Sequence, residues 1–179
     1  MGSTQLCILP SNACSGNNAL TFRLVHPDND RLSQVSPAQP NIDKNQYELF
    51  VKDNISYWVD RNIQLNSKDV KSIKIVMMEQ ELNSENWKAV EVSLNEIANN
   101  KDLTNPSMQG FIAVIILNKT GQKKLERLTE KNLKRKLAIV LKDKLLMAPL
   151  IQDKISGNEV SVVGLNYYDV KNLKEAIRQ

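Results

Sequence analysis

The residues best suited to chemistry in this 179-residue chain are two cysteines near the N-terminus and a single histidine. Cys7 and Cys14 are separated by six residues that include a proline, so they can close a short disulfide loop in an oxidising compartment. Two free thiols in a cytosolic protein are the alternative. Two thiols and a distant His26 do not supply the four ligands of a structural zinc site, so we expect no metal.

The sequence lacks the usual patterns of a catalytic site. It has no glycine-rich phosphate loop, no G-x-S-x-G, no H-E-x-x-H and no C-x-x-C. His26 precedes a proline and has no nucleophile motif beside it. Glu79, Glu81 and Glu85 could meet in space, but carboxylates in such a polar stretch are usually solvated. We therefore expect no enzyme and no cofactor.

Positive charge is concentrated in residues 119–136, which contain eight Lys/Arg and two Glu, whereas the whole chain has a formal charge of +4. A helix here would bury Leu125 and Leu128 and expose several cations. These predicted partner-binding residues are Lys123, Lys124, Arg127 and Lys131. Such a face can attract an acidic protein or bind an anionic lipid surface. The alternative is that it is only a solvated helix surface. Nucleic acid is disfavoured because no aromatic residue lies in the stretch to stack on bases.

Short apolar and alternating segments predict a protein rich in strands. The predicted strands cover residues 19–25, 47–52, 55–59, 73–78, 90–92, 111–117, 137–141, 145–148 and 159–163. Asp53 and Asn54 indicate a hairpin turn, and the strands at 137–141 and 145–148 indicate a second hairpin. We expect residues 111–117 to form a buried strand. Leu137, Ile139, Leu141 and Val160 are expected in the core of one sheet.

Fewer segments predict helices, and most of these segments begin at a residue that can act as a helix N-cap. Thr120 is the predicted cap of a helix that ends near Asn132, and Ser67 that of a single helical turn. Ser93 and Glu96 fit a capping box for a short helix, and a terminal helix is expected from about Tyr168.

Ordered short motifs in the C-terminal half resemble the periplasmic head region of SecD, an accessory subunit of the bacterial protein-export translocase. They are N-K-T-G at 118–121, L-T-x-x-N at 128–132, L-A-I-V-L at 137–141, A-P-L-I at 148–151, I-S-G at 155–157 and V-x-G at 162–164. LTFRLV at 20–25 and LNSKDV at 65–70 extend the resemblance. The chain departs from it with Asp143-Lys144 where an Asp-Gly turn is usual, and it lacks the family's transmembrane helices.

The resemblance implies an α+β fold, an antiparallel sheet with helices packed on one face in a ferredoxin-like or split β-α-β head. We expect one compact domain overall, divided into an N-terminal arm (1–18), strands and a loop (19–80), an insert (81–109) and the head-like unit (110–179). The loop around residues 26–44 and the insert match the family pattern least.

The resemblance implies a non-catalytic periplasmic module that binds a polypeptide and assists protein export. The alternative is a periplasmic immunity protein that binds and neutralises a secreted toxin enzyme. A third interpretation is a binder of anionic surfaces through the basic helix. In each case the expected partners exclude nucleic acid. A membrane enters only through an anchor that this sequence lacks, through a partner or, in the third interpretation, as an anionic lipid surface.

Overall fold

The computed structural model describes residues 20–29, 42–80, 85–105 and 110–178. Cys7 and Cys14 lie outside these residues, so the disulfide stays a prediction. The described residues form two four-stranded sheets and a separate hairpin, and every strand pairing among them is antiparallel. The α+β class is confirmed, with two packed sheets where the sequence indicated one.

The first sheet has the strand order β4-β1-β8-β9. Its strands are β4 (Leu65–Asn66), β1 (Leu20–Leu24), β8 (Leu137–Leu141) and β9 (Lys144–Met147). The predicted hairpin in this region is confirmed, because β8 pairs antiparallel with β9.

The second sheet has the order β10-β7-β5-β6. Its strands are β10 (Glu159–Leu165), β7 (Phe111–Leu117), β5 (Val70–Gln80) and β6 (Trp87–Glu91). The assignment of Val160 to the same sheet as Ile139 is wrong, because Val160 is half-buried in β10 whereas Ile139 lies in β8. Sequence periodicity shows which side of a strand is apolar but not which sheet the strand joins.

The third unit is the hairpin of β2 (Tyr47–Lys52) and β3 (Ile55–Asp60). Asp53 and Asn54 have φ of 51° and 61°, the left-handed conformation that a two-residue type I′ turn needs. Phe50 and Tyr57 pack over the outer face of the first sheet. The first sheet is therefore covered on both faces, which is why all five residues of β8 are buried.

The helical elements are η1 (Ser67–Asp69), α2 (Leu94–Ala98), α3 (Lys119–Lys131) and α4 (Tyr167–Ala176). Ser93 caps α2 as predicted, with Glu96 closing the capping box. Ser67 and Thr120 are not caps, because Asn66 and Asn118 take those positions instead. An asparagine side chain accepts from the same first-turn N–H groups as serine or threonine, so either of two nearby residues could cap each helix. In both helices the residue that comes earlier in the sequence is the cap.

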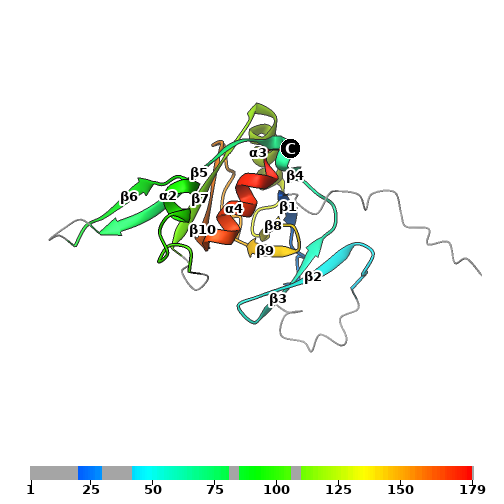
Figure 1. Ribbon diagram of the computed structural model, residues 1–179. Helices are drawn as coiled ribbons and strands as arrows, with labels where there is room; N and C mark the ends of the chain where they lie inside the picture. Colours follow the sequence, from blue (N-terminus) through cyan, green and yellow to red (C-terminus); the bar gives the residue numbers. More distant parts are fainter. Residues whose placement is uncertain (1–19, 30–41, 81–84, 106–109, 179) are drawn as a thin grey trace, which may run out of the picture.

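The main core lies between the two sheets and helices α3 and α4. Its largest fully buried side chains are Phe22, Phe111, Leu20, Leu65, Ile75, Ile97, Ile115, Leu117, Leu125, Ile139, Leu165 and Leu173. Figure 1 shows the β5–β6 hairpin and α2 extending to one side of this core and the β2–β3 hairpin lying on the other.

Candidate functional site

Helix α3 exposes all four cations that the sequence singled out. Lys123, Lys124, Arg127 and Lys131 are exposed, while Leu125 and the other apolar positions of the helix are buried. The structure therefore brings the predicted residues together on one solvent-facing side. Whether this side binds a partner stays a prediction.

Lys124 differs from the other three cations because it has a structural partner. Its Nζ lies 2.8 and 3.0 Å from the two carboxylate oxygens of Asp69, whose side chain is only 5% exposed. Among the described residues, Lys123, Arg127 and Lys131 form no ion pair. We call these three residues the basic face.

The acidic residues of α3 do not neutralise the basic face. Glu126 and Glu130 accept from Lys154, at 3.0 and 3.4 Å. The hydrogen bonds that Lys154 donates to Glu126 and then to Glu130 raise the pKa of Lys154. The two carboxylates are thus engaged by a residue that follows the first sheet, and the basic face keeps its positive charge.

The N-K-T-G motif forms a joint between α3 and η1. Asn118 Oδ1 accepts from the N–H groups of Thr120 and Gly121, while the Asn118 N–H donates to the Asp69 carbonyl oxygen at 2.9 Å. A Cβ at Gly121 would lie 2.4 Å from that same oxygen. Glycine is needed here because the two segments approach too closely for any side chain.

The L-T-x-x-N and I-S-G motifs hold the chain after β9 against α3. Thr129 is fully buried, and its hydroxyl donates to the Leu125 carbonyl oxygen and accepts from the Ile155 N–H, both at 2.9 Å. Asn132 Nδ2 donates to the Leu128 carbonyl oxygen at 2.8 Å. The motifs that carry the SecD resemblance are thus explained by packing, not by contact with a ligand.

A repeated motif, L-N-x-x-D-V, was not recognised in the sequence. It occurs at residues 65–70, which we call the first cap, and at residues 165–170, the second cap. In each, the asparagine caps a helical segment and the aspartate completes a capping box. The signal was the repeated pattern itself, with four identical residues at the same spacing. Residues 65–70 were interpreted from the sequence as a single helical turn, and the start of the terminal helix was placed near Tyr168, without relating the two segments.

A lysine from elsewhere in the chain binds each buried aspartate. Lys144 Nζ lies 2.7 and 2.9 Å from the oxygens of Asp169, just as Lys124 contacts Asp69. The departure from the SecD resemblance at Asp143-Lys144 thus supplies a side chain that binds Asp169. The left-handed residue of that turn is Lys142, with φ 56°.

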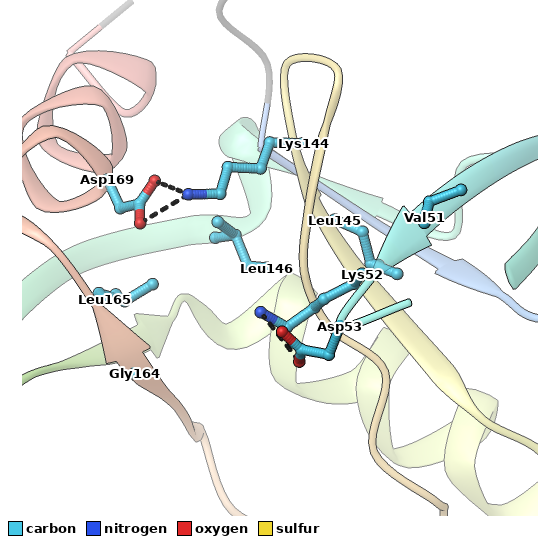
Figure 2. A pocket seen from close by; sticks show the side chains of 9 residues that line it. All are labelled: Val51, Lys52, Asp53, Lys144, Leu145, Leu146, Gly164, Leu165 and Asp169. Carbon is cyan, nitrogen blue, oxygen red and sulfur yellow. Dashed lines mark hydrogen bonds and ion pairs between the residues drawn. The ribbon is translucent and has the colours of Figure 1, made fainter. Parts of the chain in front are cut away.

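Figure 2 shows a pocket of about 230 Å³ beside the second cap, between the β2–β3 turn, β9 and β10. Its charged groups are already paired, Lys144 with Asp169 and Lys52 with Asp53 at 3.8 Å. Ligand pockets usually have volumes of about 300–1,000 Å³ and a few polar groups directed at the ligand. This pocket is therefore a gap between packed elements and a poor candidate for a ligand site.

The outer face of the second sheet is partly open along β7. Burial alternates along β7, so that Ala113 and Ile115 face the core while Ile112 and Val114 are only half-buried. The expectation of a buried strand at residues 111–117 is thus confirmed for one face only. A continuous apolar run does not reveal that no described element covers the second face.

Residues 88–179 match the family model described as SecDF, P1 head subdomain. This chain belongs to that family. The match covers more than half of the chain and includes β6 from Lys88 onward, β7 to β10 and all three α-helices of the described part. The resemblance inferred from the ordered motifs is therefore confirmed, and the chain contains a SecDF P1 head subdomain.

Two solved structures share the fold of this SecDF-family chain. One is described as "Structure and function of a membrane component SecDF that enhances protein export" and the other as "Crystal structure of SecDF in Super-membrane-facing form". Each has 18% sequence identity, a TM-score of 0.52 and covers 90% of this chain. The chain spans 62% of the first structure and 19% of the second. No curated protein sequence matches it significantly.

Two further observations concern the described residues of this SecDF-family domain. None of their helices has the length and apolar character that crossing a membrane requires. They also contain no cluster of three or more His, Cys, Asp or Glu side chains placed to hold a metal ion.

Proposed function

We propose that this chain is a non-catalytic module that binds a polypeptide in the periplasm and assists protein export. The observation that carries the proposal is the match of residues 88–179 to the SecDF P1 head subdomain. It is supported by the likeness to a membrane component described as enhancing protein export. The family match does not favour the alternative of a toxin-neutralising immunity protein.

The proposed contact surface is the basic face, together with the segments at residues 28–45 and 79–109. Lys123, Arg127 and Lys131 are exposed and are not neutralised by an ion pair within the described residues. An exposed charge acts over about 10 Å at 0.1 M salt, so such a face attracts acidic stretches of a passing chain before contact is made.

The test reverses the charges of the basic face. It leaves Lys124 in place, because Lys124 forms an ion pair with the buried Asp69. In the triple variant Lys123→Glu, Arg127→Glu and Lys131→Glu, we expect slower association with an unfolded acidic polypeptide. The rate should also lose its decrease with rising salt, because steering by charge is an ionic-strength-dependent effect. Stopped-flow measurements at low and high salt give both quantities.

The matched control is the triple variant Lys71→Glu, Lys101→Glu and Lys171→Glu. These lysines are also exposed, so the net charge changes by the same amount. Association should stay near the parental rate in this control. An equal loss in both variants would show that total charge decides the rate, and an unchanged rate in the first would remove the basic face from the proposal.

A further inference from the structure

The four outer strands of the two sheets differ in how well their edges are protected. β4 has two residues, β9 has a register shift between Ile139 and Val140 of its partner, and β10 has one between Val162 and Leu165. Short strands and bulges are devices that stop a sheet edge from pairing with another chain. β6 has five residues in unbroken register with β5 and no proline.

The backbone of β6 presents hydrogen-bonding groups away from the sheet. The N–H of Val92 donates to the Ile75 carbonyl oxygen at 2.9 Å, which fixes the hydrogen-bonding direction of the β5–β6 ladder. Because the hydrogen-bonding direction alternates along an antiparallel pair, the backbone N–H and C=O groups of Val90 and Lys88 also point toward β5. The N–H and C=O groups of Trp87, Ala89 and Glu91 therefore point outward, where β6 is the last strand of the sheet.

Apolar side chains stand next to this edge. Trp87 is 60% exposed and Met78 is 41% exposed. Met78 is paired with Ala89 across the ladder, and side chains two residues apart share a face, so Trp87, Ala89 and Met78 lie on the same face of the sheet. That face continues into the half-buried Ile112 and Val114 of β7.

We propose that the β6 edge binds an extended segment of unfolded polypeptide as an additional strand. The segment would hydrogen-bond to the outward groups of Trp87, Ala89 and Glu91 and place apolar side chains at alternate positions against Trp87 and Met78. The inference rests on the proposed function and places the binding site in one of its proposed contact segments, residues 79–109. Main-chain pairing depends little on the side chains of the guest, which suits a partner that varies in sequence along its length.

The size of the edge argues for such a segment rather than a second copy of this chain. A stable interface buries about 1,200–2,000 Å² and takes about 20–30 residues from each side. Five residues of β6 supply a quarter of that number or less. An extended peptide needs no matching surface of its own, and weak binding allows it to move on.

The test compares Ala89→Pro with Ala89→Val. Ala89 is exposed and its N–H points outward, so proline removes an edge donor and leaves the ladder to β5 intact. Valine keeps the donor and adds similar bulk. With a 15-residue peptide of alternating valine and threonine as the probe, we expect the proline variant to bind about tenfold more weakly or worse, and the valine variant to bind like the parent.

A second measurement on the parent protein covers the case in which the proline variant does not fold. Amide hydrogen exchange at Ala89 and Glu91 should slow when the peptide is added, while that at Lys88 and Val90 is already slow because these amides bond to β5. Unchanged exchange at Ala89 with the peptide bound would overturn the proposal.

The outcomes separate this inference from the proposed function. If an unfolded acidic polypeptide binds the parent and both Ala89 variants equally, the edge is not the site and the polypeptide-binding function stands. If neither probe binds the parent, the proposed function fails and the edge proposal with it. A concentration-dependent dimer that Ala89→Pro abolishes would identify a second copy as the occupant and overturn the proposal.

Discussion

The first and second caps have the same sequence pattern and each closes a capping box, but their surroundings differ. At the first cap, the start of α3 packs directly on Asp69, so closely that position 121 must be glycine. At the second cap, Asp169 borders the pocket between the hairpin, β9 and β10. A capping box with a lysine partner is thus compatible with both a tight joint and an open one.

This difference in packing indicates which of the two joints is more rigid. The first cap joins the end of β4 in the first sheet to the start of β5 in the second, and α3 fixes that connection through Asn118 and Lys124. The second cap is tied to the first sheet by Lys144, with Lys142 Nζ also donating to Asn172 Oδ1 at 3.0 Å. We expect the first cap to contribute more to global stability.

Replacing each aspartate with alanine tests the comparison most strongly. Asp69→Ala removes the acceptor of the Asn66 N–H and the partner of Lys124, and we expect a loss of about 2–4 kcal/mol in the free energy of unfolding. Asp169→Ala should cost less. Urea denaturation of both variants gives the two values, and a larger loss at Asp169 would reverse the assignment of the rigid joint.

Gly121→Ala tests the close approach at the first cap alone. The new methyl group would meet the Asp69 carbonyl oxygen at 2.4 Å, and we expect a net loss of about 1–2 kcal/mol after alanine's gain in helix propensity. Gly157→Ala is the control, because nothing lies within 4 Å of its added Cβ. Equal stability of the two variants in urea would mean that α3 can move away from η1 at little cost.

Removing the lysines should have a smaller effect. Lys124 and Lys144 have side chains 46% and 54% exposed, so water screens part of each ion pair. We expect Lys124→Met and Lys144→Met to lower stability by about 1 kcal/mol each. Thermal unfolding at low and high salt measures this, and a loss that does not shrink at high salt would point to packing of the lysine stems instead.

We expect the smallest effect on stability at the capping box of α2. This capping box is exposed, so it serves as a reference for the two buried ones. The hydrogen bond from the Ser93 backbone N–H, followed by its side-chain bond, lowers the pKa of Glu96 below its ordinary value. A lowered folded-state pKa adds stability above the unfolded pKa that is lost as pH falls through the folded value. Amide exchange in α2 should therefore quicken on acidification, and Glu96→Gln should remove that pH dependence.

Local signals in the sequence predicted most of the elements. The Asp53-Asn54 turn, the Ser93 capping box and the strand at residues 111–117 follow from backbone preferences and periodicity that act over a few residues. The division into two sheets was not predictable in this way, because it depends on which distant strands pair. The open face of β7 was missed for the same reason.

The candidate site was predictable in part. The exposure of the α3 cations follows from the helical period, but the role of Lys124 depends on Asp69, which is 55 residues away in the sequence. The free edge of β6 lies in the segment at residues 81–109, where the sequence predicted only a short strand at 90–92 and a short helix after Ser93. Its outward backbone groups are set by its register with β5 and not by the identity of its own residues.

The pairing of β1 with β8 has a consequence for the order of events as the chain folds. The paired residues are more than 110 positions apart, so the first sheet cannot close until most of the domain is available. Long-range antiparallel contacts of this kind make folding slow, because a large loop must be ordered before the contact stabilises it. Residues 88–179 made alone would have β8 without β1 and β7 without β5, and we expect that fragment to aggregate through its unpaired strands.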